Sequence, residues 1–88
     1  MKAIKILAFA DLKSAAALEA IGFNVGVDDA MNRVIYAEVE VSDVLNALNF
    51  CEELNRLDIV GSVFYNDEDY DTDEFLNKEF SDEELGVS

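Results

Sequence analysis

The chain contains no histidine and no proline, and it has a single cysteine, Cys51. Without histidine, the usual pairs of nucleophile and general base, and most transition-metal sites, cannot form. A single cysteine cannot form an internal disulfide, which fits a reducing cytosol. Cys51 lies in an apolar helical pattern with no adjacent basic residue, so we expect a buried structural thiol. The sequence therefore predicts neither an enzyme nor a cofactor.

Basic side chains are also scarce, with six lysines and arginines against twenty acidic residues and a formal net charge of −14. This balance disfavours nucleic acids and anionic membranes as direct partners, because both are bound through lysine and arginine. It favours a basic partner such as a nucleic-acid-binding protein, a basic peptide or a polyamine. The alternative is that the charge only prevents aggregation. No apolar run is long enough to predict a membrane span.

Four segments alternate in the way that is typical of strands, and two show helical spacing. The first helix should begin at Asp11 or Ser14 and end at Gly22; the second should be capped by Ser42, with Asp43 in its first turn. The predicted strands are Ala3–Phe9, Phe23–Val27, Arg33–Val41 and Ile59–Tyr65. The order predicts an α+β fold of the ferredoxin-like β-α-β-β-α-β type, with both helices on one face of a four-stranded antiparallel sheet. The main rival joins the second and third strands as a hairpin in another α+β order.

The composition changes after residue 66, and half of the acidic side chains lie between residues 67 and 84. We therefore expect a domain over residues 1–66 and an acidic C-terminal extension over residues 67–88. A short amphipathic helix should begin at Asp71 or Thr72, because Asp71-x-x-Glu74 has the spacing of a capping box. Its apolar positions are Phe75, Leu76 and Phe80.

The extension also contains the opening of an EF-hand calcium loop, Asp67-x-Asp69-x-Asp71. The match then fails, because Thr72 occupies the glycine position and Lys78 the position of the bidentate glutamate. Clustered carboxylates could bind divalent cations weakly, but we predict no dedicated metal site.

If both helices cover one face of the sheet, Tyr36, Glu38 and Glu40 belong to the other. Aromatic side chains on an open sheet stack bases in RNA-recognition domains, but here glutamates flank the tyrosine and no basic rim exists. We therefore expect a partner or homodimer interface, or a surface that the chain's own C-terminal segment covers. In the simpler alternative, that segment packs back to complete the fold.

In size, charge and lack of catalytic groups, the whole chain resembles small acidic inhibitor proteins of bacteriophages, including DNA mimics and anti-CRISPR proteins. The resemblance lies in composition, so it assigns no functional residue. It implies a cytoplasmic protein, or one acting in a host cytoplasm, that blocks a basic nucleic-acid-binding protein. On local grounds, the acidic candidates for partner contact are Asp67, Glu68, Asp69, Asp71, Asp73, Glu74, Asp28, Asp29, Glu38 and Glu40, and the apolar ones are Tyr36, Phe75, Leu76 and Phe80.

Two other functions remain open. The predicted order of elements is similar to that of amino-acid-sensing ACT domains, which pair through their sheets. Those domains usually have glycine in the first strand-to-helix turn, whereas residues 10–13 here contain none. Alternatively, the chain is an assembly adaptor whose C-terminal amphipathic helix docks into a partner's groove.

Overall fold

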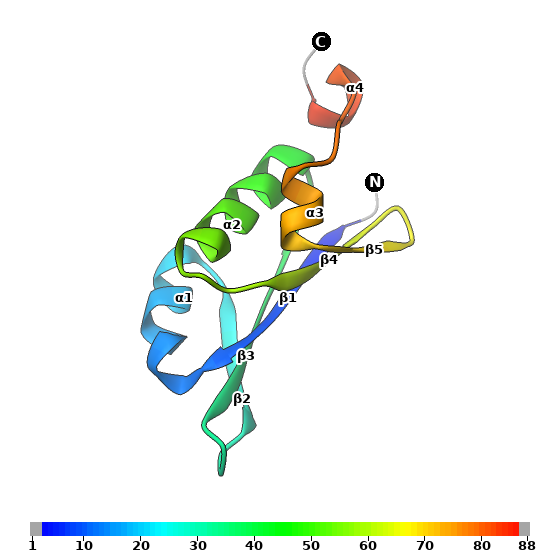
Figure 1. The fold of residues 1–88 in the computed structure, drawn as a ribbon. Coiled ribbons are helices and arrows are strands. Elements are labelled where there is room, and N and C mark those ends of the chain that lie inside the picture. Colours follow the sequence, from blue (N-terminus) through cyan, green and yellow to red (C-terminus); the bar gives the residue numbers. More distant parts are fainter. Residues whose placement is uncertain (1–2, 87–88) are drawn as a thin grey trace.

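A computed structural model describes residues 3–86 and shows an α+β fold with one five-stranded antiparallel sheet (Figure 1). The strands lie in the order β2-β3-β1-β4-β5. The elements are β1 (Ile4–Asp11), the 3-10 helix η1 (Leu12–Ser14), α1 (Ala15–Ile21), β2 (Asn24–Asp29), β3 (Val34–Val41), α2 (Val44–Arg56), β4 (Gly61–Tyr65), β5 (Glu68–Asp71), α3 (Thr72–Leu76) and α4 (Asp82–Leu85).

The α+β prediction is confirmed, but the sheet is not the predicted four-stranded ferredoxin-like sheet. A fifth strand, β5, pairs with β4 at the edge. It follows a two-residue turn in which Asn66 and Asp67 have φ values of 52° and 65°. Two successive residues with positive φ form the hairpin turn that matches the twist of the strands, and Asn and Asp tolerate this conformation. The chain therefore folds back at the point where the sequence had predicted the end of the domain.

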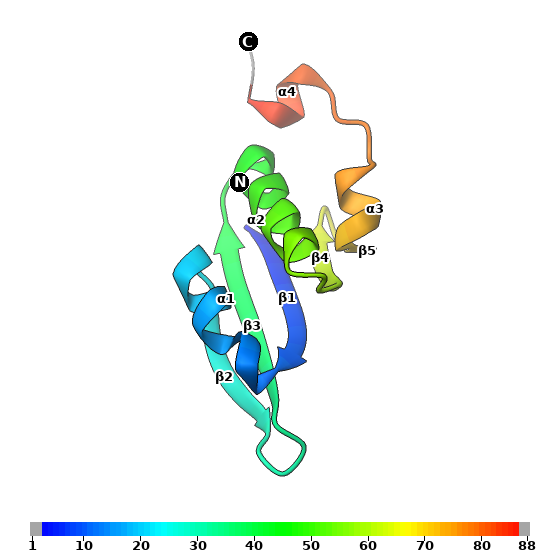
Figure 2. The same ribbon diagram turned by 60° about the vertical axis from the view of Figure 1, so that its left-hand side comes forward.

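Helices α1 and α2 lie on the same face of the sheet, and α3 lies beside α2 (Figures 1 and 2). The core fills the space between these helices and the inward side chains of the strands. On β1 those side chains are Ile4, Ile6 and Ala8, all buried. Leu54 of α2 is fully buried as well. The alternate residues of the strands form the opposite face of the sheet, which none of these helices covers.

Helix α2 begins one residue later than predicted. Asp43, not Ser42, is its N-cap, with extended backbone and a side chain that accepts a hydrogen bond of 2.8 Å from the Asn46 backbone N–H. A carboxylate suits this position because it satisfies a free N–H and faces the positive end of the helix dipole. At the start of the first helical segment, neither Asp11 nor Ser14 makes a side-chain cap hydrogen bond. Gly22 ends α1 with φ 120°, as the sequence predicted.

Residues 68–76 of the C-terminal segment, which form β5 and α3, belong to the same sheet and core. Phe75 of α3 is fully buried, and its ring lies against the rings of Tyr65, Tyr70 and Phe80 at centroid distances of 5.7, 6.0 and 5.1 Å. Thr72 is buried too, and its hydroxyl accepts a hydrogen bond of 3.1 Å from the Gly61 backbone N–H. The segment thus packs on the helix side and leaves the other face of the sheet open.

Candidate functional site

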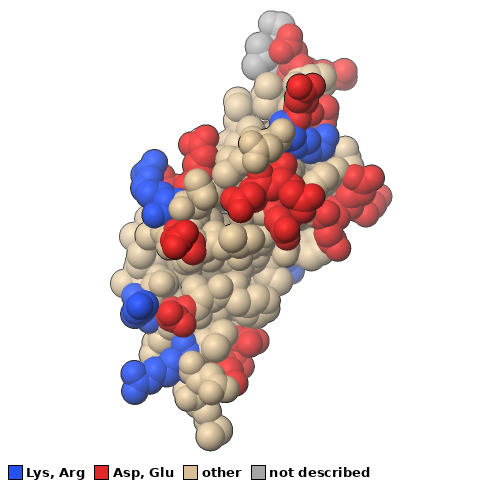
Figure 3. All heavy atoms as spheres, viewed as in Figure 1, with Lys and Arg blue, Asp and Glu red and all other residues tan. Residues whose placement is uncertain are grey.

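The acidic side chains of the C-terminal third gather at one end of the molecule. They lie on β5, α3, α4 and the connections between them, and most are exposed (Figure 3). We call this surface the acidic end; it consists of Asp67, Glu68, Asp69, Asp71, Asp73, Glu74, Glu79, Asp82, Glu83 and Glu84. The six members predicted from the sequence are all exposed and lie together here.

Lys78 is the basic residue of this segment, and its charge is turned toward aromatic rings. Its amine Nζ lies 5.0 Å from the ring centre of Phe80 and 5.9 Å from that of Tyr70, which is the geometry of a cation–π contact. Lys5 and Arg56 form ion pairs with Glu38 and Glu53, outside the acidic end. With one lysine against ten carboxylates, local basic groups offset the negative potential of the acidic end only weakly.

Two helix starts within the acidic end are held by capping boxes, and the one at α3 was predicted from the sequence. The Glu74 carboxylate accepts a hydrogen bond of 3.2 Å from the Asp71 backbone N–H. At α4, the Ser81 hydroxyl and the Glu84 carboxylate make the reciprocal pair of contacts, each 3.2 Å long. These contacts fix part of the acidic surface, so its carboxylates are presented on ordered backbone rather than on a loose tail.

The predicted calcium-loop opening adopts a different structure. Residues 68–71 form strand β5, in which Asp69 and Asp71 point to one face of the sheet instead of curving around a cation. Among residues 3–86, no three histidine, cysteine, aspartate or glutamate side chains converge as a metal site would require.

The other predicted acidic residues lie apart from the acidic end. Asp28 and Asp29 lie at the far end of the sheet, before the turn between β2 and β3. The Asp29 carboxylate accepts hydrogen bonds from the Asn32 side chain and from the backbone N–H groups of Met31 and Asn32. These bonds, chiefly those from Asn32, lower the pKa of Asp29. Asp29 therefore stabilises a turn. Glu38 and Glu40 lie on β3, on the open face of the sheet.

Of the four predicted apolar contact residues, one lies on the open face of the sheet and three pack on the helix side. The alternation of side chains along β3 places Tyr36 on the open face, where it is half-buried. Phe75 is fully buried in the core and cannot contact a partner in this structure, which corrects its assignment as a contact residue. Leu76 and Phe80 are half-buried and pack against the core. The apolar stripe of α3 is thus turned toward the chain's own sheet.

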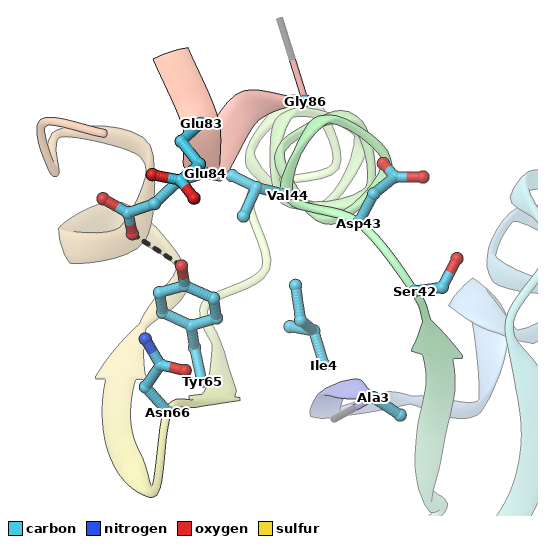
Figure 4. Close-up of a pocket in the computed structure, with 10 residues that line it drawn as sticks. All are labelled: Ala3, Ile4, Ser42, Asp43, Val44, Tyr65, Asn66, Glu83, Glu84 and Gly86. Carbon is cyan, nitrogen blue, oxygen red and sulfur yellow. Dashed lines mark hydrogen bonds between the residues drawn. The ribbon is translucent and has the colours of Figure 1, made fainter. Parts of the chain in front are cut away.

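A pocket of about 280 Å³ lies where the acidic end meets the start of α2 (Figure 4). Ile4 and Val44 point into it and supply apolar walls, while Glu83 and Glu84 supply carboxylates. Asp43 also lines the pocket, but its carboxylate points away from the cavity and caps α2. The remaining lining residues are Ala3, Ser42, Tyr65, Asn66 and Gly86. Apolar walls beneath carboxylates suit the side chain of lysine or arginine, which has an aliphatic stem and a cationic head. The pocket could not be predicted from the sequence, because four separated segments build it.

Within the pocket, the Tyr65 hydroxyl donates a hydrogen bond of 2.6 Å to the Glu84 carboxylate. This bond, with a smaller contribution from burial, raises the pKa of Tyr65 to about 12 from an ordinary value of 10.0. The same bond is the largest cause of the lowered pKa of Glu84. The bond thus favours a protonated Tyr65 and an ionised Glu84.

The Tyr65–Glu84 bond predicts a specific pH dependence. Because the Tyr65 pKa is raised on folding, its contribution to stability is complete below pH 10 and is lost as the pH rises toward about 12. Glu84 has a lowered pKa, so its contribution is present above its ordinary pKa of 4.5 and is lost at lower pH. With ¹³C-labelled tyrosine, NMR titration should give Tyr65 a midpoint near 12. Glu84→Gln should bring that midpoint toward 10, whereas Glu83→Gln should leave it near 12; equal midpoints in both variants would contradict the assignment.

Cys51 is a buried thiol on α2. Burial, with a smaller effect from the nearby Glu52 charge, raises the pKa of the Cys51 thiol to about 12, so the thiol is protonated and unreactive at neutral pH. Among residues 3–86, no helix has the length and apolarity of a membrane span.

No protein-family model, curated protein or solved structure matches this chain.

Proposed function

We propose that this chain is a non-catalytic binding protein that uses its acidic end to engage a basic surface on a nucleic-acid-binding protein. One observation carries the proposal: ten carboxylates are gathered on one ordered end of the molecule, while the lysine among them is turned toward aromatic rings. Such an arrangement presents spaced negative charge to lysines and arginines and can compete with a row of phosphates. The pocket beside α4 supports the proposal, because it offers a place for one basic side chain of the partner.

Three finer expectations belong to the same proposal. The protein would act in a cytoplasm, its own or that of a host, where a single buried thiol stays reduced. It would not bind nucleic acid itself, because its charge repels phosphates. Its first four strands with α1 and α2 would constitute a ferredoxin-like unit to which β5 and α3 have been added. The adaptor alternative is weakened by the burial of Phe75, since a docking helix needs its apolar residues free.

The proposal is tested with two variants of equal charge. In the first, Asp69, Asp73, Glu79 and Glu83 are changed to their amides; all are exposed and none caps a helix. The matched control changes Asp11, Glu19, Glu52 and Asp58, which are exposed and lie outside the acidic end. Each protein is immobilised, incubated with lysate and eluted with a salt gradient. Proteins retained by the wild type are then purified, and their affinity is measured directly, with duplex DNA as competitor.

The wild type should retain basic nucleic-acid-binding proteins that elute at moderate salt, because opposed surface charges are screened over about 10 Å at 0.1 M salt. An exposed ion pair contributes about 0.2–1 kcal/mol, so loss of four should weaken binding about fourfold or more. The control should bind nearly as tightly as the wild type. Equal weakening in both variants would show that only total charge matters, and unchanged binding in both would overturn the proposal.

A further inference from the structure

The open face of the sheet carries a continuous apolar strip. Direct cross-strand neighbours share a face, so the pairings Phe9↔Tyr36, Leu7↔Ser62 and Lys5↔Phe64 place these side chains side by side. Phe9 is 54% exposed and Phe64 41%, which are high values for phenylalanines on inner strands of a sheet. Half-buried Leu7 lies between them on β1, and half-buried Tyr36 extends the strip from Phe9 onto β3. The helices all lie on the other side, and no described segment of the chain covers this strip (Figure 2).

The Tyr36 ring lies over Gly26, its cross-strand neighbour on β2, which has no side chain to occupy that space. A Cβ atom at Gly26 would lie 2.4 Å from the Tyr36 ring carbon Cζ. The ring therefore occupies the space over the glycine and lies along the sheet instead of projecting into solvent. A ring that already lies flat on the sheet presents its apolar face to a partner without first changing its position.

Carboxylates flank the strip on both sides. The same pairings place Glu40 beside Lys5, Glu38 beside Leu7, Asp69 beside Phe64 and Asp71 beside Ser62. Lys5 is the single lysine in these rows and forms an ion pair with Glu38 at 3.4 Å. The face thus has an apolar centre and an acidic border, which is the usual anatomy of a protein–protein interface. Through β5, this border is continuous with the acidic end.

We propose that the open face is a protein-docking surface and that its partner presents an apolar patch bordered by lysine and arginine residues. The inference rests on the proposed function in that both require a basic partner; it adds that the apolar strip supplies specificity. A nucleic acid strand fits this surface poorly, because its phosphates would meet four carboxylates. A second copy fits poorly for the same reason, because each copy carries a net charge of −14 and would bring the same acidic border.

Two synthetic peptides of equal length and charge test the inference. One alternates lysine with leucine, and the other alternates lysine with serine. The variants are Phe9→Ser/Phe64→Ser and, as a matched control, Leu45→Ser/Leu57→Ser, since these leucines are 50% and 37% exposed but lie on or next to α2. Affinities are measured by titration calorimetry, with NMR of the aromatic side chains to locate the contact. Circular dichroism verifies that all variants are folded.

The leucine peptide should bind wild type at least tenfold more tightly than the serine peptide and shift the resonances of Phe9, Tyr36 and Phe64. The phenylalanine variant should lose this preference, and the leucine variant should keep it. Equal affinity of the two peptides for wild type would overturn the inference while leaving charge-led binding, and hence the proposed function, intact. Ultracentrifugation that shows a wild-type dimer, lost in the phenylalanine variant, would also overturn it by making a second copy the occupant. If neither peptide binds, the proposed function fails together with the inference.

Discussion

Replacing Phe75 with alanine is expected to remove about 3–5 kcal/mol from the free energy of unfolding, the usual cost of emptying a fully buried phenylalanine site. The Phe75 ring is fully buried and lies against the rings of Tyr65, Tyr70 and Phe80. These neighbours come from β4, from β5 and from the segment after α3, so they cannot close the cavity by a small shift of one element. A domain of this size has a total stability of only about 5–10 kcal/mol. The variant should therefore unfold at much lower urea concentration, as measured by circular dichroism.

Phe64→Ala is the matched control, because Phe64 lies on the same sheet but is 41% exposed on the open face. Its loss should cost less than about 1 kcal/mol, as is usual for surface substitutions that leave no cavity. The difference between the two variants measures how far the C-terminal segment is part of the core. If both variants have the same urea midpoint, α3 does not hold the sheet in the way that the structure shows.

Gly61→Ala is expected to destabilise the fold by about 1–3 kcal/mol or more, because the added methyl group collides with backbone. A Cβ atom at Gly61 would lie 2.7 Å from the Leu7 carbonyl oxygen and 3.1 Å from the Cβ of Ala8. Both belong to β1, the strand that pairs with β4 at this position. Relief requires the two strands to separate, which would also strain the buried hydrogen bond from Gly61 to Thr72. Thermal unfolding should show a clear fall in the melting temperature.

Gly26→Ala provides the comparison for Gly61→Ala. Its added methyl group would also make a close contact, but with the Tyr36 ring, which lies at the surface and can rotate away. We expect a loss of less than about 1 kcal/mol, together with altered NMR signals of Tyr36. A melting temperature for Gly61→Ala no lower than that for Gly26→Ala would show that the two strands tolerate the methyl group.

Local signals in the sequence were enough to predict α1, α2, the start of α3 and the first four strands. Phe80, which the sequence placed on the same helix as Phe75, lies beyond the end of α3. The alternation in β3 and the helical spacing in α2 both produced elements near their predicted bounds. At the start of α2, Ser42 and Asp43 are both good N-caps, and only the backbone path shows that the aspartate holds the position. Such one-residue choices depend on how the preceding strand enters the helix, which a pattern of residue types does not contain.

The fifth strand was missed for a different reason. Residues 68–71 have three carboxylates in four positions, which is a poor strand pattern, and the acidic composition obscured the turn signal of Asn66-Asp67. The open-face candidates Glu38 and Glu40 followed from alternation alone. The pocket beside α4 could not be predicted, because its lining comes from β1, α2, β4 and α4, and only the tertiary fold brings those segments together.

The acidic composition of β5 disfavours aggregation of the protein through this edge of the sheet. A strand at the border of a sheet exposes unpaired N–H and C=O groups and can recruit strands of other molecules into fibrils. Here that border is only four residues long and carries Glu68, Asp69 and Asp71, so an approaching copy meets like charge before any backbone pairing can begin. The same short stretch that completes the sheet also opposes its growth at this edge.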